Sequence, residues 1–208
     1  MRGAQVLASL VLVSPGLRER KKQQTREALS LAAIRLTVER GLDNVRVEEI
    51  AEAAGVSPRT FNNYFASKAE AISARHLDRM RHANEQLRTR SADEPLWEAI
   101  SQVLIAQYAG GDPSPEWLSG VRVLTAEPAL QGEFMRADAV AEAEFAEVIA
   151  ERTGTDVTTD MYPSLVSASV GAVVRVVLQR WMSADPPGPL EPLLRDGLAQ
   201  LAAGLPTP

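Results

Sequence analysis

The residues best suited to chemistry lie at positions 47–65, in the segment VEEIAEAAGVSPRTFNNYF. Apolar residues at helical spacing predict two short helices here, and Gly55 between them suits a turn that needs a left-handed backbone. Ser57 followed by Pro58 is typical of a helix start, with serine at the N-cap and proline at the first helical position. The pattern indicates a helix-turn-helix.

The second of these helices carries polar side chains that can recognise DNA. The residues expected to pack at the helix crossing are Ile50, Ala51, Val56, Phe61 and Phe65. Arginine can bind guanine and asparagine can bind adenine, whereas threonine and tyrosine can reach backbone oxygens. In such motifs the N-terminal part of the second helix enters the major groove. The outward-facing set is Arg59, Thr60, Asn62, Asn63 and Tyr64.

Over about residues 18–72 the chain resembles the DNA-binding domain of the TetR family of transcriptional regulators. The resemblance is carried by an I-A-x-x-A-G-V turn at residues 50–56, by an aromatic-bearing second helix, and by F-x-S-K at residues 65–68. It implies that Pro58, Arg59 and Thr60 face base edges. It also implies that Tyr64 and Lys68 hold phosphates, Lys68 beside the positive N-terminus of the next helix.

Two positions depart from the family pattern. Arg46 stands where the family often has threonine, which removes a helix cap but brings a cation within reach of a phosphate. Asn62 stands where the family commonly has an aromatic residue, and it can read a base instead. Arg59 and Lys68 have an alternative reading as ordinary solvated charges. The full candidate DNA-binding set is Arg46, Ser57, Pro58, Arg59, Thr60, Asn62, Asn63, Tyr64 and Lys68.

The remaining pattern is also helical, and no stretch alternates apolar and polar residues as a strand would. The pattern becomes helical from Leu17, and a first helix carrying Leu29, Ala32, Ala33 and Leu36 is expected to end at Arg40. Further helices are expected over residues 67–90, 96–108, 116–126, 130–152, 164–182 and 190–201. The expected fold is all-α: an N-terminal three-helix helix-turn-helix DNA-binding domain, then a C-terminal helical ligand-binding and dimerisation domain. The expected limits are 17–66 for the first and 67–208 for the second, with residues 67–90 as the connecting helix. Residues 1–16 are expected to be a disordered extension, with a signal peptide as the alternative.

Charge separates the two halves of the chain. Residues 1–90 contain 16 Lys and Arg against 10 Asp and Glu, whereas residues 91–208 contain 6 against 17. A basic front on an acidic body indicates that only the front meets a polyanion. Just ahead of the first helix, a basic cluster is expected either to follow the DNA backbone or minor groove or to be a disordered lead-in. It consists of Arg18, Arg20, Lys21 and Lys22.

The acidic body has two expected roles. In the first, its last two helices pair with those of a second copy as a four-helix bundle, as they do in the family; the alternative is that they fill the chain's own core. The candidate dimer-interface residues are Val170, Val174, Val177, Trp181, Leu194 and Leu198. In the second, residues 95–150 enclose a small molecule, for which few inward charges favour an apolar or amphipathic compound. The candidate ligand-pocket residues, which can alternatively be plain core, are Trp97, Leu104, Tyr108, Trp117, Leu124 and Phe134.

A helical adaptor and an enzyme are the alternative functions. The absence of cysteine excludes thiolate zinc sites and thiol nucleophiles, and His76 and His82 are too far around one helix to share a metal. No phosphate-binding glycine loop or nucleophile motif is present, so no catalytic residue, metal or cofactor is expected. No apolar run reaches the roughly 18–20 residues of a membrane span, which favours a cytoplasmic protein without a membrane partner. The sequence predicts a ligand-responsive regulator, more readily a repressor, that binds a palindromic operator in double-stranded DNA as a homodimer and responds to an unidentified small-molecule effector.

Overall fold

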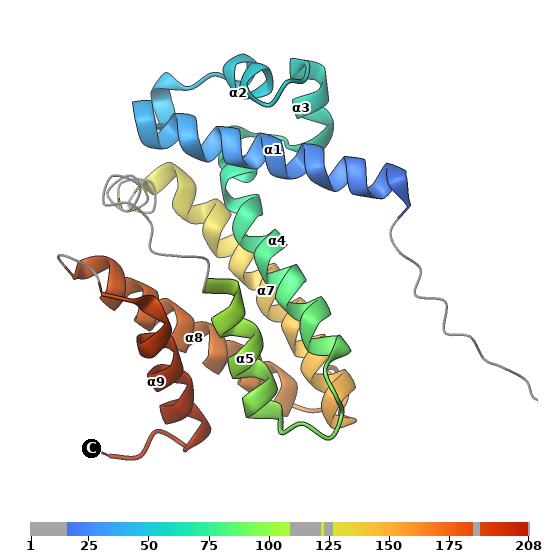
Figure 1. Ribbon diagram of the computed structural model, residues 1–208, viewed down its shortest axis with the longest axis vertical. Helices are drawn as coiled ribbons and strands as arrows, with labels where there is room; N and C mark the ends of the chain where they lie inside the picture. Colours follow the sequence, from blue (N-terminus) through green and yellow to red (C-terminus); the bar gives the residue numbers. More distant parts are fainter. Residues whose placement is uncertain (1–15, 109–121, 123–126, 185–187, 208) are drawn as a thin grey trace, which may run out of the picture.

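The computed structural model describes residues 16–108, 122, 127–184 and 188–207. Within these residues every regular element is helical, which confirms the predicted all-α fold (Figure 1). The helix predicted over residues 116–126 and the extension before residue 16 fall outside them. The elements are α1 (Leu17–Arg40), the 3-10 turn η1 (Leu42–Asn44), α2 (Val47–Ala53), α3 (Pro58–Tyr64), α4 (Lys68–Thr89), α5 (Leu96–Tyr108), α7 (Pro128–Thr153), α8 (Tyr162–Ser183) and α9 (Leu190–Ala202).

Three helix ends form where local sequence predicts them. At the start of α3 the Ser57 hydroxyl accepts the backbone N–H of Thr60 at 3.2 Å. At the start of α4 the Ser67 hydroxyl accepts the N–H of Glu70 at 3.0 Å. Gly154 ends α7 with φ at +67°, a left-handed conformation that glycine adopts without steric cost.

The helices form two groups, each around its own apolar core. We call α1, η1, α2 and α3 the head, and α5, α8 and α9 the body; α4 and α7 run side by side between them (Figure 1). The head core is closed by residues of α4 and by Leu130 of α7. Its main buried residues are Leu29, Ala33, Ile50, Phe61, Phe65, Ile72 and Leu130. The body core has as its main buried residues Leu87, Ile100, Leu104, Val148, Ile149, Val170, Leu194 and Leu198.

Polar contacts fix how α4 lies against α7. Three side-chain contacts join the two helices in sequence order: the imidazole of His76 with the carboxylate of Asp138, and the ion pairs Arg81–Glu144 and Arg88–Glu151. Beyond them, the guanidinium of Arg152 donates hydrogen bonds to backbone carbonyls at the end of α4, among them those of Leu87 and Arg90 at 3.2 Å each. Single surface ion pairs contribute little stability, but this series sets the register of the two helices.

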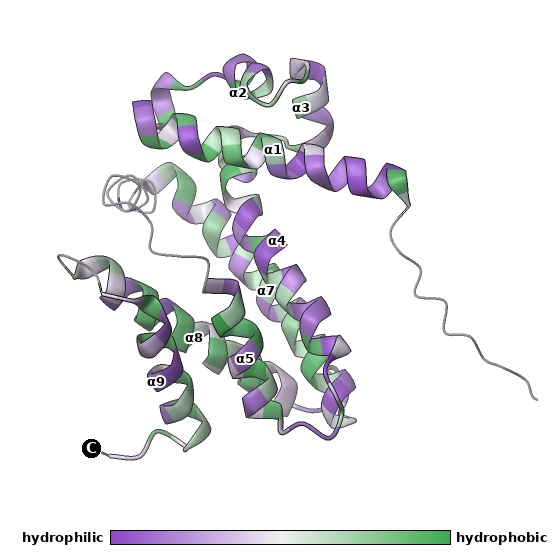
Figure 2. Ribbon diagram, viewed as in Figure 1, coloured by the Kyte–Doolittle hydropathy of each residue, from purple (hydrophilic) through white to green (hydrophobic). Residues whose placement is uncertain are grey.

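Helix α8 packs one apolar face into the body. By length and composition alone it could cross a membrane, yet Val166, Val170, Val174 and Val177 are buried in the body core. Figure 2 shows the corresponding apolar faces of α5, α8 and α9 turned toward one another. The packing of α8 in the body core therefore explains its apolar character.

The six candidate dimer-interface residues are all buried in this single chain. They lie between 1% and 8% exposed, as expected if they fill the chain's own core. Their part in a dimer interface stays a prediction. The large hydrophobic side chains that α8 leaves exposed are Tyr162, Leu165 and Val176.

Candidate nucleic-acid interface

The turn between α2 and α3 is closed by backbone hydrogen bonds around Gly55. The N–H of Gly55 donates to the carbonyl of Glu52, and the N–H of Val56 donates to that of Ala51, each at 2.9 Å. This is the Schellman pattern of a helix end, and it places Gly55 at φ +70°. A side chain at this φ is strained, which explains why the motif has glycine here.

Two buried aromatic residues fix which face of α3 looks outward. Phe61 is 0% exposed and Phe65 is 2% exposed, and their ring centroids lie 5.8 Å apart in the head core. Because Phe61 points inward, the opposite face of this short helix must point to solvent. The exposed residues on and before α3 are Ser57, Pro58, Arg59, Asn62 and Asn63, with Thr60 and Tyr64 half-buried.

The structure thus brings most of the predicted DNA-binding residues to one surface. Arg59, Asn62 and Asn63 make no hydrogen bond or ion pair through their side chains within the described residues, so these groups are available to a ligand. Ser57 and Thr60 are less available, since their hydroxyl oxygens are hydrogen-bonded to each other at 2.9 Å. These two side chains stabilise the start of α3.

Arg46 lies at the start of α2 with its side chain exposed. Glu49 compensates for the missing side-chain cap, because its carboxylate accepts the backbone N–H of Arg46 at 2.8 Å. The same carboxylate accepts a hydrogen bond from Arg40, also at 2.8 Å. The hydrogen bond from the backbone N–H of Arg46 lowers the pKa of Glu49. Burial opposes this with a smaller effect, and the charge of Arg40 lowers the pKa further. The guanidinium of Arg46 remains at the surface at the start of α2.

Lys68 has a structural contact that its sequence position does not reveal. Its half-buried ammonium donates hydrogen bonds to the carbonyl of Leu42 and, at 2.8 Å, to that of Val45. These carbonyls flank η1, the turn that leads into α2, so Lys68 ties the start of α4 to the front of the helix-turn-helix. An ammonium has three hydrogens, which leaves one for a phosphate oxygen.

The basic cluster of residues 18–22 lies within α1 and not ahead of it. Arg18, Arg20, Lys21 and Lys22 are exposed on its first two turns, which extend beyond the head (Figure 1). Lys22 forms a surface ion pair with Glu19 at 3.5 Å. A helix that presents cations in this way suits contact with a phosphate backbone.

Arg26 links the head to α4, and sequence reasoning did not single it out. Its guanidinium carbon lies 4.7 Å from the centre of the Phe65 ring, a cation–π contact. Its Nε donates to the Asp78 carboxylate at 3.0 Å, and both side chains are mostly buried. Since its partners lie far along the chain, only the folded structure shows this link.

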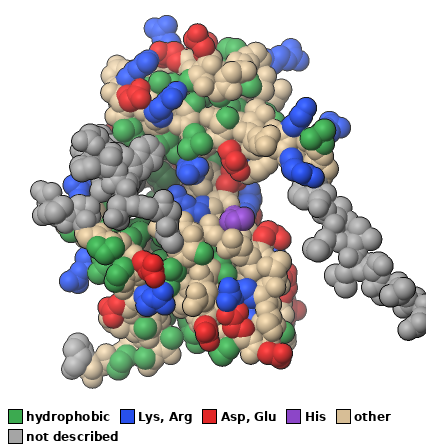
Figure 3. All heavy atoms as spheres, viewed as in Figure 1, with side chains coloured by type: hydrophobic (Ala, Val, Ile, Leu, Met, Phe, Trp, Pro, Cys, Tyr) green, Lys and Arg blue, Asp and Glu red, His purple; other side chains and the backbone are tan. Residues whose placement is uncertain are grey.

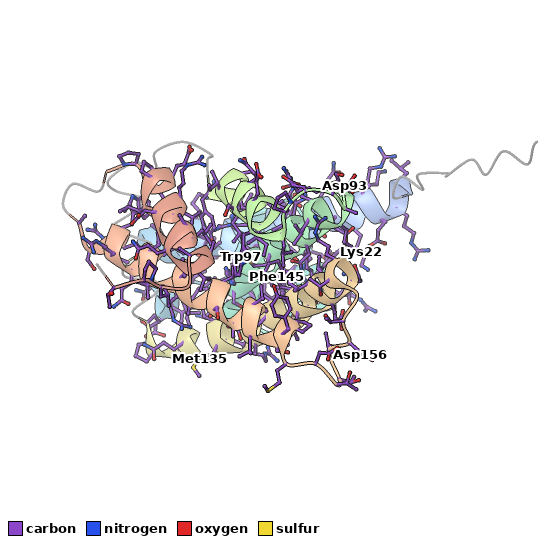
Figure 4. All side chains as sticks on the ribbon, turned by 90° about the horizontal axis from the view of Figure 1, so that it is seen from below. Lys22, Asp93, Trp97, Met135, Phe145 and Asp156 are labelled. Carbon is purple, nitrogen blue, oxygen red and sulfur yellow. The ribbon has the colours of Figure 1, made fainter. Side chains whose placement is uncertain are left out.

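The candidate ligand-pocket residues divide between the two cores. Trp97, Leu104 and Tyr108 belong to or pack against the body core. Figure 4 shows Trp97 and Phe145 toward the middle of the molecule in that view, where both pack half-buried against the body core, while the exposed Met135 lies at the edge. Phe134, in contrast, packs against the head core, because it lies on the part of α7 that reaches the head. Trp117 and Leu124 lie outside the described residues.

Known families match most of the chain. Residues 31–74 match the family described as bacterial regulatory proteins, tetR family, and residues 94–206 match the MftR C-terminal domain. One relative is the HTH-type transcriptional regulator TcmR of Streptomyces glaucescens. It is 36% identical over 178 residues, which cover 80% of this chain and 77% of TcmR.

Solved structures share the fold. Thermus thermophilus FadR, a TetR-family repressor in complex with lauroyl-CoA, aligns with a TM-score of 0.55 at 22% identity, over 88% of this chain and 96% of FadR. NalD of Pseudomonas aeruginosa, the secondary repressor of the MexAB-OprM multidrug efflux pump, aligns with a TM-score of 0.55 at 18% identity, over 89% of this chain and 97% of NalD. The family matches, the identity to TcmR and the helix-turn-helix geometry lead to one conclusion: the chain belongs to the TetR family of bacterial transcriptional regulators.

Proposed function

We propose that this regulator is a repressor that binds a palindromic operator as a homodimer and leaves it when a small amphipathic effector binds the body. It acts in the cytoplasm, and by binding rather than by catalysis. The observation that carries the proposal is the exposed polar face of α3, held outward by the buried rings of Phe61 and Phe65.

Some residues of this surface contact DNA bases and others contact the DNA backbone. Arg59, Asn62 and Asn63 read base edges in the major groove, because their side chains are exposed and chemically suited to paired hydrogen bonds. Ser57, Pro58 and Thr60 form the start of α3 that approaches the groove. Backbone phosphates are contacted by Arg46, Tyr64 and Lys68 and by the basic turns of α1.

The outer face of α8 supports a homodimer. Leu165 and Val176 are 58% and 61% exposed, and about three helical turns separate them, so both lie on one side of α8. Ala168 and Ala172 lie between them on the same side, where small side chains allow a second helix to approach closely. A single helix-turn-helix makes few base contacts, and a twofold dimer on a palindrome doubles them.

Release by an effector needs a connection from body to head, and α4 and α7 supply it. Ile72 and Leu130 of these helices are buried in the head core, while Leu87 and Ile149 of the same helices are buried in the body core. A ligand that shifts the body therefore shifts the heads. Repression follows most simply, since a protein that blocks a promoter needs no contact with polymerase.

The test is selection of bound duplexes from a random DNA pool, with wild type and Arg59→Ala in parallel. We expect wild type to recover an inverted repeat. Arg59→Ala should bind it more weakly by about 1–3 kcal/mol and tolerate more bases at one position. Arg195→Ala, which removes the same charge from exposed α9, is the matched control and should behave as wild type.

Two results would contradict this assignment. If Arg59→Ala loses as much affinity for random DNA as for the selected site, Arg59 does not read a base. If folded wild type enriches no sequence, α3 does not recognise an operator, and the proposed function fails.

A further inference from the structure

Two arginines on α4 lie side by side without a carboxylate partner within the described residues. Arg75 and Arg79 are one helical turn apart, and neither forms an ion pair there. Other arginines of the same helix do: Arg81 pairs with Glu144 and Arg88 with Glu151. Arg75 is exposed and Arg79 half-buried; partial burial lowers the pKa of Arg75 and the charge of Arg79 lowers it further, while Glu27 opposes the shift. An anion placed between the two guanidinium groups would relieve their repulsion.

A buried hydroxyl lies beside this pair. The guanidinium carbon of Arg79 is 5.2 Å from the centre of the Tyr108 ring, at the end of α5. The hydroxyl group of Tyr108 is buried, and no group of the described structure accepts a hydrogen bond from it. Burial raises the pKa of Tyr108, Arg79 opposes this through its charge and a side-chain hydrogen bond, and Asp138 adds to it, so the hydroxyl keeps its proton and can donate. A buried donor without an acceptor is costly and rare.

The neighbouring polar groups are already engaged. Farther along the same face of α4, Gln86 accepts a hydrogen bond from Gln107 at 3.0 Å and lies 3.0 Å from the ring nitrogen of His82. Of the nearby carboxylates, Asp138 pairs with His76 at 2.8 Å and Glu27 accepts from Gln23 at 3.1 Å. The hydrogen-bond donors left for an anion are therefore the hydroxyl of Tyr108 and, nearer the head, the guanidinium groups of Arg79 and Arg75.

These donors lie where the body meets the head. Helix α5 ends at Tyr108, and α4 continues past it to the head core. Figure 3 shows several Lys and Arg side chains on the surface between head and body, with an acidic side chain and a histidine beside them. On the other side Tyr108 packs against the apolar body core, one helical turn from Leu104. The positively charged arginine pair and the apolar body core therefore lie next to each other, with Tyr108 between them.

We propose that Arg75, Arg79 and Tyr108 bind the anionic group of the effector, a carboxylate, sulfonate or phosphate, whose apolar part lies against the body core. The inference rests on the proposed role of the body as an effector-binding domain. It narrows the effector from any apolar or amphipathic compound to an amphipathic anion. It also places the charged group against α4, one of the two helices that enter the head.

The test compares two fluorescent probes that differ only in charge. 1-Anilinonaphthalene-8-sulfonate is anionic, and N-phenyl-1-naphthylamine is the same ring system without the sulfonate. We expect the full-length wild type to bind the sulfonate more tightly. Arg79→Met keeps the apolar stem and should weaken sulfonate binding roughly tenfold while leaving the neutral probe unchanged, as expected when a charge-assisted hydrogen bond is lost. Arg75→Met should act in the same direction, and Tyr108→Phe should weaken the sulfonate by about threefold.

Arg35→Met is the matched control, because Arg35 is exposed on α1 and its loss changes the net charge equally. Equal binding of the two probes, no binding of the sulfonate, or an equal loss in Arg79→Met and Arg35→Met would overturn the inference. Circular dichroism confirms that each variant is folded. DNA binding is measured on the same samples. If wild type recognises no operator, the proposed function fails, and the binding of the two probes still decides whether the anion site exists. If wild type binds an operator but Arg79→Met binds both probes as tightly as wild type does, only the anion site fails.

Discussion

Replacing Lys68 with methionine should destabilise the protein, although lysine is commonly a surface residue. Its ammonium donates to the carbonyls that flank η1, and methionine keeps the apolar stem but makes neither bond. Hydrogen bonds from a charged donor each contribute about 1.5–3 kcal/mol. The Leu42 carbonyl also accepts the N–H of Val45 at 3.4 Å, so only the Val45 carbonyl loses its partner entirely. We therefore expect a net loss of about 2–3 kcal/mol in the free energy of unfolding.

This loss should be visible as a lower melting temperature. For a chain of this length, 1 kcal/mol shifts the midpoint by roughly 2–4 °C, so Lys68→Met should melt about 4–12 °C below wild type in a circular dichroism scan. Arg59→Met is the matched control. It removes an exposed cation whose side chain makes no hydrogen bond or ion pair within the described residues, so its melting temperature should stay at the wild-type value.

DNA titrations separate the two possible roles of Lys68. If its third hydrogen also reaches a phosphate, Lys68→Met should flatten the dependence of log affinity on log salt by about 0.9 per protomer, or about 1.8 for the homodimer. A melting temperature within about 1 °C of wild type would refute the structural role. An unchanged salt slope would refute the phosphate contact, whichever way the melting temperature moves.

Three further outcomes follow from the described contacts. Phe61→Ala should lower the free energy of unfolding in urea by about 3–5 kcal/mol, because the ring is fully buried in the head core; a loss below about 1 kcal/mol would contradict that packing. Val176→Arg should leave the fold intact but yield a monomeric mass in light scattering, since it puts a charge on the exposed stripe of α8; a dimeric mass would exclude that stripe as the interface. The carboxylate of Glu49, whose pKa is lowered in the folded state, stabilises the fold above its ordinary value of 4.5 and ceases to do so as pH falls through the lower folded value. Glu49→Gln should therefore reduce the fall in melting temperature on acidification, and an acid profile identical to wild type would show that the contact to Arg46 contributes nothing.

Local sequence predicts the helices well because their ends depend on near neighbours. Ser57 and Ser67 cap the residues three positions on, and Gly55 and Gly154 supply left-handed ends within their own turns. The exposed face of α3 is equally local, since a single inward phenylalanine, Phe61, sets the direction of a seven-residue helix.

Contacts between distant residues are where the sequence is insufficient. Lys68 reaches carbonyls 26 and 23 residues away, so its type and position suggested only a phosphate contact. Helix α8 is apolar on more than one side, and periodicity cannot distinguish the side that meets the chain's own core from the side left exposed. Sequence reasoning placed Phe134 with the ligand-pocket residues of the body. It packs in the head instead, because α7 is long enough to reach the head core.

The position of Leu130 limits how freely the parts of this protein can be exchanged. Leu130 belongs to α7 yet is 0% exposed within the head core, with Phe134 packed beside it. A fragment that stops after α4 would leave an apolar hole where Leu130 sits, and a foreign body grafted onto this head would have to present matching side chains at that point. Chimeras built to combine this operator specificity with another sensor should therefore transplant the first two turns of α7 together with the head.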